Sequence, residues 1–96
     1  MLAKTPIEQR FINWVAEQPP ERRYQWHNHS KCACGLFLRE EMGLTVNEVT
    51  RGYVAVVAGT SYDPDVFTVW ETFNSLAQCD SKDSTFGSLR KRLEAQ

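Results

Sequence analysis

Apolar residues recur at helical spacing along most of this chain, and typical helix-start residues precede them. Thr5-Pro6-Ile7-Glu8 combines a capping threonine, a proline at the first helical position and a glutamate suited to a capping box. Because Pro19-Pro20 cannot continue a helix, the pattern predicts a first helix that ends before them. The apolar face of this helix is formed by Ile7, Phe11, Trp14 and Val15.

A second helix is predicted from Lys31 to Met42, with Ser30 as its capping residue and Gly43 as its closing glycine. Its apolar residues spread nearly all round the helical wheel. A helix that is apolar on most sides is typically buried, so this one is expected at the centre of the fold.

Residues 20–30 are predicted to form a loop or an extended arm between these two helices. In an extended arm, Tyr24 and Trp26 point the same way because successive side chains alternate. We expect both rings to cover the core while each keeps its polar atom toward water.

Residues 45–59 carry two conflicting signals. Tyr53-Val54-Ala55-Val56-Val57 has the composition of a β-strand. Thr45 and Glu48, however, have the spacing of a capping box, and the apolar residues keep helical spacing up to Gly59. The pattern favours a helix, with a short strand at 53–57 as the alternative.

The last third of the chain contains two more helical patterns, separated by a predicted polar loop at 79–84. Asp63-Pro64 begins one helix that runs to about Gln78. Its inward face is predicted to hold Val66, Phe67, Trp70, Phe73, Leu76 and Ala77. The final short helix directs Phe86, Leu89 and Leu93 inward and Arg90, Lys91 and Arg92 largely outward. The sequence thus predicts a mainly α protein, a compact bundle of about five helices in a single domain over residues 1–96.

Composition narrows the class of protein. A hydrophobic fraction of 42% supports a packed globule, and no apolar run is long enough to span a membrane. The N-terminus lacks the apolar core of a signal peptide, so a cytoplasmic protein with reduced cysteines is expected. A net charge of −1 gives no overall attraction to nucleic acid, which is therefore not expected as a partner. Residues 44–80 are acidic and the last residues basic, a difference that ordinary solvated helix faces also explain.

Both histidines and two of the three cysteines fall within residues 27–34. A zinc site would use His27, His29, one of these cysteines and Cys79, but ligands so close in sequence cannot easily converge on a tetrahedron. A cysteine peptidase needs a histidine base from a later segment, and no histidine follows His29. The sequence therefore predicts no metal, no cofactor and no enzymatic activity. Cys32 and Cys34 are expected as small apolar residues of a buried helix.

The start of the second helix is also a candidate site for a small anion. Free backbone N–H groups and the helix dipole favour negative charge at such a position. An aromatic side chain beside it could stack on a base, so a nucleotide-like ligand is conceivable. The candidate ligand-binding residues are Arg23, Tyr24, Trp26, His27, His29, Ser30 and Lys31.

Four short motifs in the chain suggest a relationship. They are Phe11-Ile12-Asn13-Trp14, the arm around Tyr24-Gln25-Trp26, the run from Cys32 to Leu38 with its Cys-Ala-x-x-x-Phe-Leu pattern, and the closing Thr-Phe-Gly-x-Leu-x-x-Arg-Leu at 85–93. In this arrangement the chain resembles a group of small uncharacterised proteins of bacteria and their phages. The resemblance implies no catalytic residues. It implies a phage or prophage accessory protein, a class that often binds and blocks a host protein or a small signalling molecule.

Three functions follow as hypotheses. The leading one is a non-enzymatic protein that binds a host protein, as an inhibitor or adaptor, through the acidic 44–80 region or the aromatic 24–26 arm. The alternative is a binder or sponge of a small anionic ligand at the helix start near 26–31. A cysteine- or zinc-dependent enzyme is the least favoured. A homo-oligomer stays open under each of them.

Overall fold

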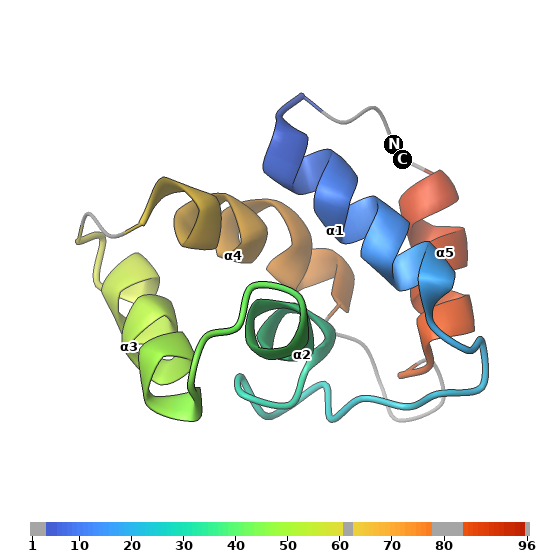
Figure 1. Ribbon diagram of the computed structural model, residues 1–96, viewed down its shortest axis with the longest axis horizontal. Coiled ribbons are helices and arrows are strands. Elements are labelled where there is room, and N and C mark those ends of the chain that lie inside the picture. Colours follow the sequence, from blue (N-terminus) through green and yellow to red (C-terminus); the bar gives the residue numbers. More distant parts are fainter. Residues whose placement is uncertain (1–3, 61–62, 78–83, 96) are drawn as a thin grey trace.

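The computed structural model describes residues 4–60, 63–77 and 84–95. Within these residues the chain forms five α-helices and no strand, which confirms the predicted mainly α bundle (Figure 1). The helices are α1 Pro6–Glu17, α2 Ala33–Glu40, α3 Val46–Val57, α4 Pro64–Ala77 and α5 Phe86–Glu94. In Figure 1, α2 lies at the middle of the molecule, with α3 on one side and α1 and α5 on the other. No helix in this described part of the chain has the length and apolar character needed to cross a membrane.

The first helix forms where its sequence predicts, but the Glu8 carboxylate accepts from the Thr5 hydroxyl group and not from the Thr5 backbone N–H, as a complete capping box would require. The Thr5 hydroxyl accepts a hydrogen bond from the backbone N–H of Glu8 and donates one to the Glu8 carboxylate at 2.8 Å. The helix ends at Glu17, two residues before the prolines. Its predicted apolar residues Ile7, Phe11, Trp14 and Val15 are all buried.

The central helix is shorter than predicted at both ends. Ser30 does not cap it, because its hydroxyl donates to the Asn28 side chain at 2.9 Å and residues 28–32 form tight turns. The cap is Cys32, whose sulfur accepts from the Gly35 N–H at 3.4 Å. The helix therefore begins at Ala33. It ends at Glu40, and Gly43, with a φ of 73°, turns the chain away as predicted.

Residues 46–57 form a helix, so the alternative of a strand at 53–57 is wrong. The capping box is complete: the Thr45 hydroxyl accepts from the Glu48 N–H, and the Glu48 carboxylate accepts from the Thr45 N–H. Gly59 ends the helix region with a φ of 72°. The capping box at the start and the glycine at the end thus favour a helix, although the residues between them have the composition of a strand.

Two predictions for the last helices are wrong. Phe67 is 42% exposed, because the buried face of α4 runs through Val66, Val69, Trp70 and Phe73 instead. Arg92 turns inward rather than outward. Phe86, Leu89 and Leu93 are buried as predicted.

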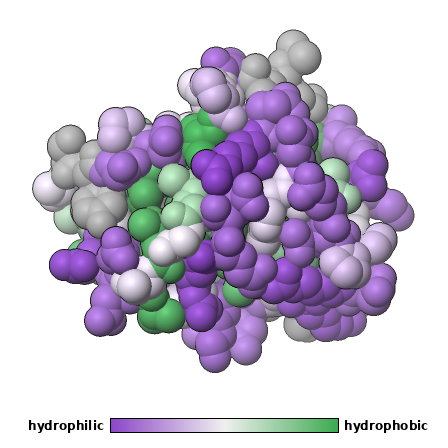
Figure 2. Space-filling model, viewed as in Figure 1, coloured by the Kyte–Doolittle hydropathy of each residue, from purple (hydrophilic) through white to green (hydrophobic). Residues whose placement is uncertain are grey.

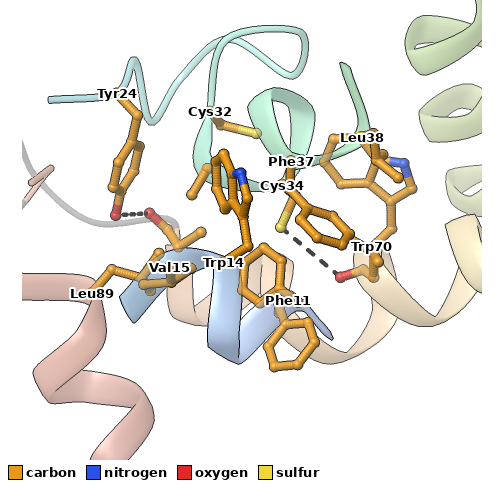
Figure 3. Close-up of a cluster of buried hydrophobic side chains, with 14 of the residues drawn as sticks. Phe11, Trp14, Val15, Tyr24, Cys32, Cys34, Phe37, Leu38, Trp70 and Leu89 are labelled. Carbon is orange, nitrogen blue, oxygen red and sulfur yellow. Dashed lines mark hydrogen bonds between the residues drawn. The ribbon is translucent and has the colours of Figure 1, made fainter. Parts of the chain in front are cut away.

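The core is an aromatic cluster between α1, α2, α4 and α5 (Figure 3). Phe11 stacks on Phe73 with ring centroids 4.2 Å apart and meets the edge of Phe37 at 5.1 Å. Trp14 continues the cluster to Phe37 and Phe86. The main neighbours of α3 are α4 and α2, so its outer face stays outside this cluster.

Candidate functional site

The structure separates the seven predicted ligand-binding residues into three groups. Tyr24 belongs to the core: it is 4% exposed, and its hydroxyl donates to the Ala77 carbonyl oxygen at 2.9 Å (Figure 3). The same hydroxyl accepts from Arg92 Nη2 at 2.7 Å. The expectation that Tyr24 keeps its polar atom toward water is therefore wrong. Arg23 lies beside it, in an isolated antiparallel bridge with Thr85.

Ser30 and Lys31 belong to the turns that lead into α2. The Ser30 carbonyl oxygen accepts from Arg39 at 3.2 Å, while the Lys31 side chain is exposed. The backbone of His29 and Ser30 packs against the first turn of α2 so closely that a Cβ at Gly35 would collide with the His29 carbonyl oxygen. This backbone covers the helix start, so the geometry does not favour an anion there.

The other three residues, Trp26, His27 and His29, do come together. They line a hollow of about 160 Å³ with three residues from other elements, Cys32, Tyr53 and Asn74. We call it the ring hollow. The His29 ring lies parallel to the Tyr53 ring, with centroids 4.8 Å apart and an interplanar angle of 5°. Trp26 meets His27 edge to face at 5.4 Å.

Sequence reasoning missed Tyr53 and Asn74 as lining residues. Tyr53 was placed only on the apolar face of its helix, and Asn74 was not singled out. One signal was present: Asn74 lies one turn after Trp70, where a polar amide borders the apolar face of α4. A polar residue beside a buried face is a recognisable candidate for a lined pocket.

The two cysteines of the window, Cys32 and Cys34, are both buried. Burial raises the pKa of the Cys32 thiol, against smaller lowering effects of backbone N–H groups such as that of Gly35. Burial also raises the pKa of the Cys34 thiol well above its ordinary value, and the nearby Cys32 adds to this. The Cys34 thiol contacts the Val69 carbonyl oxygen at 3.9 Å (Figure 3). A catalytic cysteine requires the opposite pKa shift.

No cluster of three or more histidine, cysteine or acidic side chains suited to a metal ion occurs among the described residues. Cys79, the remaining candidate ligand, lies outside them.

A second hollow adjoins the first. It has a volume of about 350 Å³, lies between α3 and α4, and shares Tyr53 and Asn74 with the ring hollow. We call it the α3–α4 groove; its other lining residues include Val56, Val57, Trp70 and Glu71. The Trp70 indole Nε1 is buried and has no hydrogen-bond partner in the described part of the chain.

Exposed apolar side chains lie on both helices that form this groove. Val54 is 56% exposed and Val57 is 68% exposed. Val46 lies on the same side of α3, because the three valines are at most about 80° apart around the helix axis. Phe67 stands one turn before Glu71 on α4. Figure 2 shows hydrophobic surface gathered over the region of α3.

A further depression, of about 430 Å³, lies elsewhere, beside α1. It is open and polar at its edge, where Arg10 Nε pairs with the Glu41 carboxylate at 3.2 Å. Because this charged pair is already satisfied, the depression is the weaker candidate.

Comparison with known proteins gives no further guidance. No family model, no curated protein and no solved structure matches this chain.

Proposed function

We propose that this chain is a non-enzymatic binding protein that holds an apolar, basic segment of another protein in the α3–α4 groove. The exposed valines of α3 carry the proposal. Single exposed apolar residues are ordinary, but Val46, Val54 and Val57 share one side of α3, and Val57 lines the groove. Exposed apolar side chains that gather on one side of a helix are typical of interaction sites.

The acidic residues of the groove and of α4 favour a basic partner. Glu71 lines the groove, and Asp63 and Asp65 stand at the start of the same helix. Arg51 is the only basic residue in the described part of 44–77. Charge complementarity steers association and suppresses unsuitable partners. The occupant that fits is an amphipathic segment with apolar residues on one face and lysine or arginine beside them.

The origin of this segment follows from the resemblance to small bacterial and phage proteins. We propose a host protein as the partner, met in the cytoplasm, with the chain acting as inhibitor or adaptor. The buried thiols support a role without covalent chemistry, because their raised pKa values keep them protonated at neutral pH.

The test uses a designed amphipathic peptide. An 18-residue helical peptide of leucine and lysine is titrated into the protein by calorimetry, beside a control peptide with glutamate in place of lysine. We expect saturable binding of the lysine peptide alone, weakened by salt because the charges are exposed. Equal binding of the glutamate peptide would contradict the proposal.

Variants locate the interaction. Val54→Ser/Val57→Ser should weaken binding of the lysine peptide about tenfold or more, while Glu71→Gln should weaken it less and reduce its salt dependence. The matched control is Ala16→Ser/Glu17→Gln, which makes similar exposed changes on α1 and should leave the affinity unchanged. If the wild-type protein is a dimer that Val54→Ser/Val57→Ser dissolves, the valine face serves a second copy and the proposal fails.

A further inference from the structure

The ring hollow differs from the groove in shape and in the chemistry of its walls. Its volume of about 160 Å³ is close to that of a cavity of about 150 Å³ that holds one benzene ring. Drug-sized ligands occupy pockets of about 300–1,000 Å³. The hollow therefore fits a single ring and is too small to enclose a nucleotide.

The walls are suited to a flat aromatic guest. The parallel rings of His29 and Tyr53 and the indole of Trp26 present aromatic surface to it. The Cys32 sulfur forms another part of the wall, and sulfur packs favourably at the edge of aromatic rings. Four elements meet here: the 26–29 loop, the start of α2, α3 and α4.

One lining group can recognise a polar edge on that guest. The Asn74 side chain makes no hydrogen bond within the described part of the chain. An amide that lines a small aromatic hollow can accept from a hydroxyl group and donate to it. We propose that the ring hollow binds one aromatic ring of the phenol class, with its hydroxyl group hydrogen-bonded to Asn74.

This site does not depend on the protein partner proposed above. The hollow adjoins the groove, with which it shares the lining residues Tyr53 and Asn74, so the phenol ring has two possible sources, a free small molecule or the side chain of a tyrosine. The recognising chemistry is the same in both cases.

The test is an NMR titration of ¹⁵N-labelled protein with phenol, and in parallel with benzene. We expect saturable shifts of the Asn74 side-chain amide and the Trp26 indole N–H, with a Kd on the order of 1 mM for so small a ligand. The Trp14 indole lies at the α1 depression and serves as an internal control that should not shift. Benzene should bind about three- to tenfold more weakly, since it lacks the hydroxyl group.

Asn74→Ala should make phenol and benzene bind with equal affinity. The control is Asn47→Ala, which changes an exposed asparagine of α3 and should preserve the difference in affinity.

A titration with N-acetyl-L-tyrosinamide distinguishes the two sources of the ring, free phenols and tyrosine side chains. Binding at least as tight as that of phenol assigns the hollow to tyrosine side chains, and much weaker binding assigns it to free phenols. Absence of saturable shifts at 10 mM phenol, or equal affinity of the wild type for phenol and benzene, would overturn the proposal. Because this titration uses no peptide and no valine variant, its failure leaves the proposed function standing.

Discussion

Tyr24 and Trp26 lie two residues apart in one arm, yet they end in regions of opposite character. Tyr24 is packed at the α1–α5 end, and its hydroxyl group is hydrogen-bonded to Ala77 and Arg92. Trp26 lines the ring hollow at the α3–α4 end. At the first end polar atoms find partners inside the protein. At the second, the Asn74 amide and the Trp70 indole have none among the described residues. This contrast separates polar groups that hold the fold together from the Asn74 amide, which lines a hollow and is available for a ligand.

The largest expected effect of a single substitution lies in the aromatic cluster. Phe11→Ala removes a ring that is fully buried and contacts Phe37 and Phe73. We expect it to lower the free energy of unfolding by about 3–5 kcal/mol, through lost burial and the cavity left behind. Urea denaturation monitored by circular dichroism measures this loss.

Val57→Ser is the matched change at the α3–α4 end. Because Val57 is 68% exposed, this variant should stay within about 0.5 kcal/mol of the wild type. If Phe11→Ala and Val57→Ser lowered the free energy of unfolding by similar amounts, Val57 would belong to the core. The proposed contrast between the two ends of the molecule would then be wrong.

The second prediction compares two tyrosines. Tyr24→Phe deletes a buried hydroxyl that serves the Ala77 carbonyl oxygen and the Arg92 guanidinium group. We expect a loss of about 1–3 kcal/mol in the free energy of unfolding, because a buried carbonyl and a charged group each lose a partner. Tyr53→Phe should cost much less, since no hydrogen bond of the Tyr53 hydroxyl occurs within the described residues. The same denaturation experiment compares them, and equal losses would refute the distinction.

Local signals in the sequence predicted most of the helices. Helix-end signals act on backbone groups only a few positions away, so their effect does not depend on the rest of the fold. Examples are Thr5 with Glu8, Thr45 with Glu48, and Gly59. The start of α2 was misjudged because Ser30 was expected to cap it. In the turns at 28–32, the Ser30 hydroxyl donates a hydrogen bond to the Asn28 side chain and so does not cap the helix. The capping residue is Cys32, and cysteine is not a usual cap.

The candidate site was only half visible in the sequence. Trp26, His27 and His29 were found because reactive side chains concentrate there. Tyr53 and Asn74 come from distant helices, and their approach depends on how α3 and α4 pack. The inward turn of Arg92 has the same origin. Its partners are Tyr24 and the Leu76 carbonyl oxygen at the end of α4, and sequence spacing carries no information about either distance.

The last prediction concerns a pH-dependent effect, that of the two buried thiols. Burial raises the pKa of Cys32 and of Cys34 above the ordinary thiol value of 9.0. The folded chain then keeps both protons at a pH where the unfolded chain releases them. Stability from this source is complete below pH 9 and is lost as the pH rises through the folded pKa values. Each thiol should lower the free energy of unfolding by about 1.4 kcal/mol per pH unit in that range.

Urea denaturation between pH 7 and 10, under reducing conditions, checks this dependence. Tyrosines and lysines also titrate near pH 10, so the measured quantity is the difference between the wild type and Cys34→Ala. The variant should be less stable than the wild type at pH 7, because it leaves a cavity, and should lose less stability toward pH 10. Parallel profiles would show that Cys34 ionises as readily in the folded protein as in the unfolded chain. In that case the thiol would not be shielded as its position against Val69 requires.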